Sequence, residues 1–189
     1  MLNLHALAWE VRRGLSLNHG FGQLKGLMEM IGWKLRMGAK LLPPANVYLI
    51  PNHLFIMNII IWNSRGALKP NFQNHVRELA RSHDLAIFVV METKLGGERA
   101  REIIDRLPFD GAIHTDTIGY AGGLWLLWNS DKVEVQALAN TKQEIHVEVK
   151  VRSVDSAWLF SAICASLRSE ERQVLWNNLA KVAELHNKP

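Results

Sequence analysis

The sequence predicts an α/β fold, and three observations support this prediction. Short apolar runs rich in β-branched residues alternate with segments whose apolar residues recur at helical spacing. Between residues 58 and 91, an apolar run, a helical segment and a second apolar run follow one another as a strand–helix–strand unit. Apolar residues make up 48% of the 189 residues, which is enough for a substantial core and excludes a globally disordered chain.

The chain divides near Pro43 and Pro44, where its composition changes. Before this point, residues 22–42 carry apolar side chains at helical spacing and are interpreted as an amphipathic packing helix or leader sequence, with membrane-surface binding as the alternative. The length is that of one domain with an extension. We therefore assign residues 1–56 to an N-terminal extension, helical or poorly ordered, and residues 57–189 to the domain.

The first predicted strand covers residues 58–62 and ends at Asn63, and a turn is expected over residues 64–66. A helix follows, because apolar residues recur at helical spacing at Phe72, Val76, Leu79 and Ala80. Residues 85–91 form a second apolar strand. Such a unit usually places its two strands parallel, with a right-handed crossover.

The next elements are a short helix over residues 98–107, ended by Pro108, and a short strand over residues 111–115. Residues 122–128 are almost continuously apolar, which predicts a strand covered on both faces. Residues 132–138 and 144–151 alternate between apolar and polar side chains, which predicts two half-exposed strands of a meander.

Residues 158–165 predict a further apolar strand. Ser169 is expected to cap a final helix that carries two glutamates in its first turn, where negative charge is favourable. The expected core face of this helix consists of Leu175, Leu179 and Val182.

Several functional classes are excluded by composition. A single cysteine, Cys164, rules out an internal disulfide and a multi-cysteine zinc site, and we expect no disulfide-linked partner. The eight histidines show no His-Glu-x-x-His pattern. We interpret Cys164 as a small core residue and not as a nucleophile, because no histidine is placed by the sequence to activate it.

Neither a membrane span nor a secretory signal is expected. The most apolar stretch, residues 47–62, is interrupted by Pro51, Asn52, His53 and Asn58, and residues 1–16 lack a small-residue cleavage pattern. The expected location is therefore intracellular, nuclear or cytoplasmic. The net charge of +4 is compatible with a polyanionic partner without requiring one.

The candidate chemistry lies at Asn63 and Glu92, which end the two strands of the strand–helix–strand unit. If these strands are parallel neighbours, both side chains emerge at the edge where open α/β sheets bind ligands. A carboxylate suits Mg²⁺ or Mn²⁺, and an amide can donate a hydrogen bond to a phosphate oxygen. The alternative is ordinary turn chemistry, since many strands end in Asn or Glu.

Four strings resemble the endonuclease/exonuclease/phosphatase family, whose fold is the DNase I-like fold. They occur in the family's order and lie within residues 57–185, and the third is similar to plant LINE-type retrotransposon endonucleases. The strings are residues 58–66 (NIIIWNSRG), 91–94 (METK), 119–128 (GYAGGLWLLW) and 172–179 (RQVLWNNL).

The resemblance implies a four-layer α/β sandwich and a metal-dependent DNA endonuclease. Carried over to this sequence, Glu92 and Asn63 are the catalytic residues and hold Mg²⁺ (or Mn²⁺), Glu92 as the main ligand, and Asn63 also contacts the scissile phosphate. Lys94 is expected to steer the DNA backbone, its alternative being an ordinary solvated lysine. Arg65 is expected either to contact phosphate or to brace the first loop.

The sequence departs from the family pattern in two respects. Cys164 occupies the place of a tyrosine that helps to bind phosphate, and a thiol is the poorer hydrogen-bond donor. The family's Asp-x-Asn and Asp-His motifs do not occur in the 189 residues. The resemblance therefore implies an incomplete, N-terminal portion of the domain that binds metal weakly and is inactive alone, or alternatively a non-catalytic remnant or nucleic-acid-binding module. We also expect marginal stability, with exposed apolar surface on the strand near residues 124–128.

Overall fold

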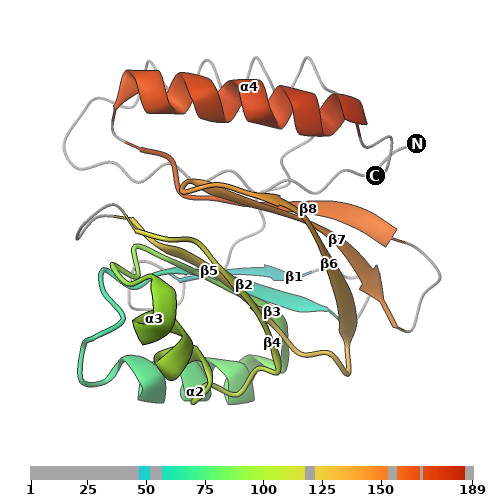
Figure 1. Ribbon diagram of the computed structural model, residues 1–189. Coiled ribbons are helices and arrows are strands. Elements are labelled where there is room, and N and C mark those ends of the chain that lie inside the picture. Colours follow the sequence, from blue (N-terminus) through green and yellow to red (C-terminus); the bar gives the residue numbers. More distant parts are fainter. Residues whose placement is uncertain (1–46, 52–56, 118–121, 153–156, 167, 186–189) are drawn as a thin grey trace.

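The computed structural model describes residues 57–117, 122–152, 157–166 and 168–185, and also the backbone of residues 47–51. Two β-sheets pack face to face, and helices cover the outer face of each sheet (Figure 1). The order of layers is helices α2 and α3, the first sheet, the second sheet, and helix α4. The predicted four-layer α/β architecture is thus confirmed.

The first sheet has the strand order β1-β2-β3-β5-β4 and the second the order β6-β7-β8. The first sheet and its helices comprise β1 (Val47–Pro51), β2 (Asn58–Asn63), α2 (Phe72–His83), β3 (Leu85–Met91), α3 (Gly97–Ile104), β4 (Gly111–His114) and β5 (Leu124–Trp128). The second sheet and its helix comprise β6 (Val133–Asn140), β7 (Glu144–Val151), β8 (Ala157–Ile163) and α4 (Ser169–Leu185).

The unit β2–α2–β3 forms as the sequence predicts. Strands β2 and β3 are parallel, with Asn63 opposite Met91, and β3 is buried along its whole length. Helix α2 packs Phe72 and Val76 against the outer face of the sheet. The Asn58 side chain donates to the carbonyl of His83 at 2.7 Å, which fastens the end of α2 to the start of β2.

Strand β5 is covered on both faces by other parts of the described chain. Leu124 and Leu126 belong to the core between the sheets, whereas Trp125 and Leu127 belong to the core beneath α2 and α3. All four side chains are fully buried. The exposed apolar surface expected on this strand is therefore not found, because the second sheet covers its inner face.

Strand β7 departs from the expected half-exposed pattern. Its inner residues Ile145, Val147 and Val149 face the core between the sheets. Its outer residues Glu144 and His146 are also buried, each with 1% exposure. Helix α4 lies over this outer face and removes it from water (Figure 1).

Strand β1 was not predicted, although it lies within the stretch 1–56 that was assigned to an extension. It pairs antiparallel with β2 and forms one edge of the first sheet. The helix expected over residues 22–42 lies outside the described residues. Among the residues described, no helix has the length and hydropathy needed to cross a bilayer.

Helix α4 begins at Ser169, but this residue is not its side-chain cap. The Ser169 hydroxyl donates instead to the carboxylate of Glu170 at 3.2 Å. Of the expected core face, Leu175 is fully buried, whereas Leu179 and Val182 are only half-buried. Since its underside meets a polar strand face, α4 needs fewer apolar contacts than its length suggests.

We expect Leu127→Ala to lower the free energy of unfolding by about 2–5 kcal/mol, because it opens a cavity beneath α2 and α3. The same substitution at Leu68, which is 61% exposed, serves as the matched control and should cost less than about 0.5 kcal/mol. Urea unfolding measures both. Equal losses of unfolding free energy in the two variants would contradict the burial of Leu127 beneath α2 and α3.

The sequence also predicts marginal stability. A sharp, cooperative urea transition of the wild type would contradict that prediction.

Candidate functional site

The candidate site lies at the carboxyl edge of the parallel strands β2 and β3. Asn63 ends β2 opposite Met91, and Glu92 is the next residue along β3. Neighbouring strands lie about 4.8 Å apart, so the two residues share one rim of the sheet. Both are half-buried. The roles predicted for their side chains remain predictions.

The loops that follow β2 and β3 are tied together by Ser64, which is buried. Its backbone N–H donates to the Met91 carbonyl at 3.0 Å, and its hydroxyl donates to the same carbonyl at 3.1 Å. The backbone N–H of Ala67 donates to the Thr93 carbonyl at 2.9 Å. These bonds fasten the two loops to each other and to the strand ends.

A third connection comes from the two glycines that precede β5. Thr93 and Lys94 donate their backbone N–H groups to the carbonyls of Gly123 (3.2 Å) and Gly122 (2.9 Å), respectively. Gly123 has φ +87°, and a Cβ there would lie 2.2 Å from the Thr93 hydroxyl oxygen. Only glycine allows β5 to approach the loop containing Glu92 this closely.

Three non-glycine residues of these loops have left-handed backbone conformations. The φ angles are +53° at Arg65, +52° at Glu92 and +59° at Lys94. A left-handed conformation costs about 1–2 kcal/mol for such a residue, and strained residues concentrate at functional sites. At Glu92 this conformation ends the alternation of side chains between the two faces of β3, and it sets the direction of the carboxylate.

The side chain of Asn63 is held by a short-range bond. Its Oδ1 accepts from the backbone N–H of Arg65 at 3.2 Å. An amide oxygen has two lone pairs and an amide nitrogen two protons, so Asn63 keeps capacity to bind a ligand. Within the described part of the chain, no hydrogen bond occupies the Glu92 carboxylate.

The two basic residues predicted to bind phosphate are exposed on the same rim. Arg65 follows Asn63 in the first loop, and Lys94 follows Glu92 in the second. The stem of Lys94 lies beside the first loop, since a Cβ at Gly66 would be 3.9 Å from Lys94 Cδ. Two cationic side chains thus flank the amide and the carboxylate.

Cys164, just beyond β8, brings the second sheet to this rim. The thiol lies near the main chain of Glu92, and the residue packs partly buried against the core between the sheets. The pKa of the thiol is raised to about 11, chiefly because the group is buried; the main chain of Glu92 lowers this pKa and the charge of Glu92 raises it. The thiol stays protonated at neutral pH, consistent with a packing role and not with a nucleophile.

The described residues do not make a complete metal centre. No group of three or more His, Cys, Asp or Glu side chains in this part of the chain is arranged to hold a metal ion. Mg²⁺ prefers six oxygen ligands, whereas this edge offers one carboxylate and one amide. The residues present therefore do not fit a resident magnesium ion.

Sequence reasoning missed four features near this site. They are the backbone bonds from the loop after β3 to Gly122 and Gly123, the proximity of Cys164 to Glu92, the hydrogen bonds from Gln143 to residues 164, 166 and 171, and the burial of Glu144 and His146 on β7. Glu144 and His146 are two residues apart, a spacing that puts both on one strand face. That face was expected to meet solvent, and only the position of α4 shows that it does not.

No protein-family model and no curated protein matches the chain. Among solved structures, the AP endonuclease LMAP from Leishmania major is similar, with a TM-score of 0.44 and 14% sequence identity. The alignment covers 74% of this chain and 47% of that one, so the chain spans about half the length of its neighbour. A likeness at this level carries no argument about function. The strands, helices and polar rim define a class: a two-sheet α/β sandwich with a candidate site at a parallel strand edge.

We expect Gly123→Ala to lower the free energy of unfolding by about 1–3 kcal/mol, because it adds a steric clash to an unfavourable φ. Gly122→Ala is the matched control: its φ is +74°, but nothing lies within 4 Å of an added Cβ. Urea unfolding compares the two variants. If Gly122→Ala is as destabilising as Gly123→Ala, the close approach of β5 does not constrain the site.

The Cys164 thiol should ionise with a midpoint near pH 11 instead of its ordinary 9.0. Since the folded-state pKa is raised, the stability from the neutral thiol is fully present below pH 9.0 and is lost as pH rises through about 11. Thiolate absorbance near 240 nm, taken as the difference from Cys164→Ala, measures the midpoint. A midpoint near 9.0 would show that the thiol is not buried beside Glu92.

Proposed function

We propose that this chain is a nuclease-like domain that binds the phosphodiester backbone of DNA at the carboxyl edge of β2 and β3. One observation carries the proposal: the parallel register places Asn63 beside Met91 and Glu92, with Arg65 and Lys94 close after them. An amide donor and two cations suit phosphate oxygens, and a carboxylate among them suits a cation or a water molecule.

The finer assignment rests on the resemblance to retrotransposon endonucleases of the plant LINE type. In this proposal, Asn63 donates a hydrogen bond to a phosphate oxygen, and Arg65 and Lys94 pair with neighbouring phosphates. Mg²⁺ is often bound through one or two carboxylates together with substrate phosphates. Glu92 would therefore hold Mg²⁺ or Mn²⁺ only when DNA supplies further oxygen ligands.

Hydrolysis by the 189-residue chain alone is proposed to be slow or absent. The sequence contains neither of the motifs, Asp-x-Asn and Asp-His, that the resemblance assigns to the general base and its partner. General acid–base catalysis typically contributes about 10²–10⁴-fold in rate. A non-catalytic nucleic-acid-binding module is the second candidate, and the small set of metal ligands at Glu92 favours it.

Alanine at Arg65 or Lys94 should weaken binding of duplex DNA and lower the slope of log K against log salt by about 1 each. Fluorescence anisotropy over a salt series measures this, with Lys181→Ala, an exposed lysine of α4, as the control. Unchanged slopes in both variants would contradict the proposed interface.

A nicking assay separates the two candidate functions. Nicking of supercoiled plasmid with Mg²⁺ that disappears in Glu92→Ala would establish the enzyme, whereas salt-sensitive binding without nicking would establish the binding module.

A further inference from the structure

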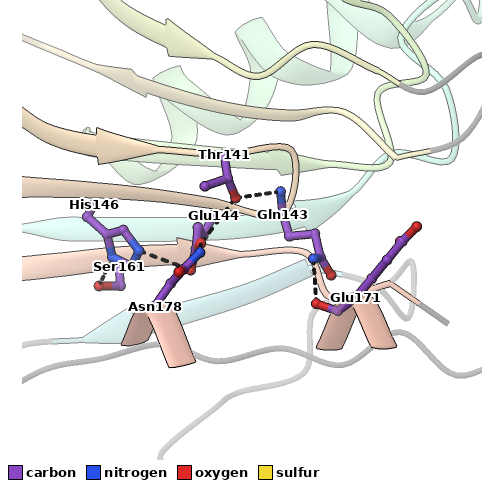
Figure 2. A network of polar contacts seen from close by, with 7 residues as sticks. All are labelled: Thr141, Gln143, Glu144, His146, Ser161, Glu171 and Asn178. Carbon is purple, nitrogen blue, oxygen red and sulfur yellow. Dashed lines mark hydrogen bonds and ion pairs between the residues drawn. The ribbon is translucent and has the colours of Figure 1, made fainter. Parts of the chain in front are cut away.

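The surface between β7 and α4 is polar although it is buried. Glu144 and His146 on β7 and Ser161 on β8 are 1%, 1% and 2% exposed, and all lie on the face of the sheet that α4 covers (Figure 2). A buried carboxylate is costly unless hydrogen-bond donors surround it. Here Glu144 Oε1 accepts from the Thr141 hydroxyl at 3.1 Å and from Asn178 Nδ2 of α4 at 2.6 Å.

The second carboxylate oxygen faces a histidine. Glu144 Oε2 lies 3.1 Å from His146 Nε2, an electrostatic contact without good hydrogen-bond alignment. His146 Nδ1 lies 2.8 Å from the Ser161 hydroxyl (Figure 2). This Ser–His–Glu chain resembles a hydrolase triad in composition only, because the burial of Ser161 leaves no approach for a substrate.

The neighbouring residue, Gln143, clamps the segment that follows β8. Its carbonyl accepts from the backbone N–H of Cys164 at 2.7 Å, and its Oε1 accepts from the N–H of Ser166 at 2.7 Å. Its Nε2 donates to the carbonyl of Glu171 in the first turn of α4 at 2.9 Å (Figure 2). One residue thus holds Cys164, Ser166 and Glu171.

These bonds matter at the candidate site because Cys164 packs against the core cluster that contains Met91, and its thiol lies near the main chain of Glu92. Helix α4 has one fully buried side chain, Leu175, and polar bonds from Gln143 and Glu144 add to its attachment to the sheet. Residues 164–166 and the first turn of α4, here called the docked segment, are tied to the start of β7 by the bonds of Gln143. Gln143 fixes the start of this segment, and the bond from Glu144 to Asn178 fixes the helix behind it.

We propose that Gln143 and Glu144 are positioning residues that hold the docked segment, residues 164–166 and the first turn of α4, against the Glu92 edge and so set the spacing of the two sheets at the site. We assign neither residue a contact with DNA; both act through the segment that they fasten. The inference rests on the proposed function for its meaning in catalysis, whereas the positioning itself is measurable without any substrate.

The single thiol of the chain can report on this spacing, since Cys164 is partly buried against the core between the sheets and should become more exposed if the segment moves away. Modification of the native protein by N-ethylmaleimide at fixed pH should be about tenfold faster in Gln143→Ala, which loses two side-chain bonds. Asn178→Ala should accelerate it in the same direction. Gln143→Glu, which keeps the acceptor for Ser166 but loses the donor to Glu171, should lie between Gln143→Ala and the wild type.

Asn177→Ala is the matched control, because Asn177 is adjacent on the same helix but exposed. Wild-type modification rates in both Gln143→Ala and Asn178→Ala would overturn the proposal, as would equal acceleration by Asn177→Ala. Should Gln143→Ala fail to fold by circular dichroism, Asn178→Ala decides, since it alters a helix surface and leaves the sheet sequence intact.

A DNA assay on the same variants separates this inference from the proposed function. If the wild type nicks plasmid, Gln143→Ala should lower kcat more than it raises KM, because it disturbs geometry and not DNA contacts. An unchanged kcat alongside faster thiol modification would overturn the link to catalysis. If the wild type neither nicks nor binds DNA, the proposed function fails, while the thiol measurement still decides whether Gln143 positions the segment.

Discussion

The parallel pairing of β2 with β3 is the constraint on which the rest of the structure depends. It places Asn63 opposite Met91 and therefore brings the following residue, Glu92, to the same rim. A shift of register by one residue would turn every side chain of β3 to the opposite face. Such a shift is prevented because β3 is buried on both faces, between the core shared with the second sheet and the core beneath α2 and α3.

Unfavourable conformations are concentrated at one end of this well-packed core. Arg65, Glu92 and Lys94 adopt left-handed conformations there, and Gly123 approaches the second loop more closely than any other residue could. Each of these features lowers stability by itself. They persist because Ser64 and the two glycine carbonyls hold the loops with backbone bonds anchored in buried strands. The buried strands thus hold the strained backbone of the rim residues in place.

The second sheet differs from the first because its outer face is polar although a helix covers it. Its inner face is apolar and joins the common core, but the outer face of β7 carries a carboxylate and an imidazole beneath a helix. Burial of these groups is tolerated because Thr141, Asn178 and Ser161 supply partners at hydrogen-bond distance. Polar attachment is directional, since each donor must meet one acceptor. Helix α4 and the loop before it are therefore held in one position above β7.

The sequence by itself determined the order and type of nearly all the described elements, since hydrophobic periodicity is a local property of the chain. It also singled out Asn63 and Glu92, because each ends a strand of one recognisable unit. What only the tertiary structure decided depends on contacts between distant segments: the pairing of β1 with β2, the burial of Glu144 and His146 by α4, and the meeting of Cys164 with Glu92. An alternating strand has the same sequence pattern whether water or a helix covers its polar face. The neighbours that a side chain meets are set by how the layers pack, and no local pattern encodes that packing.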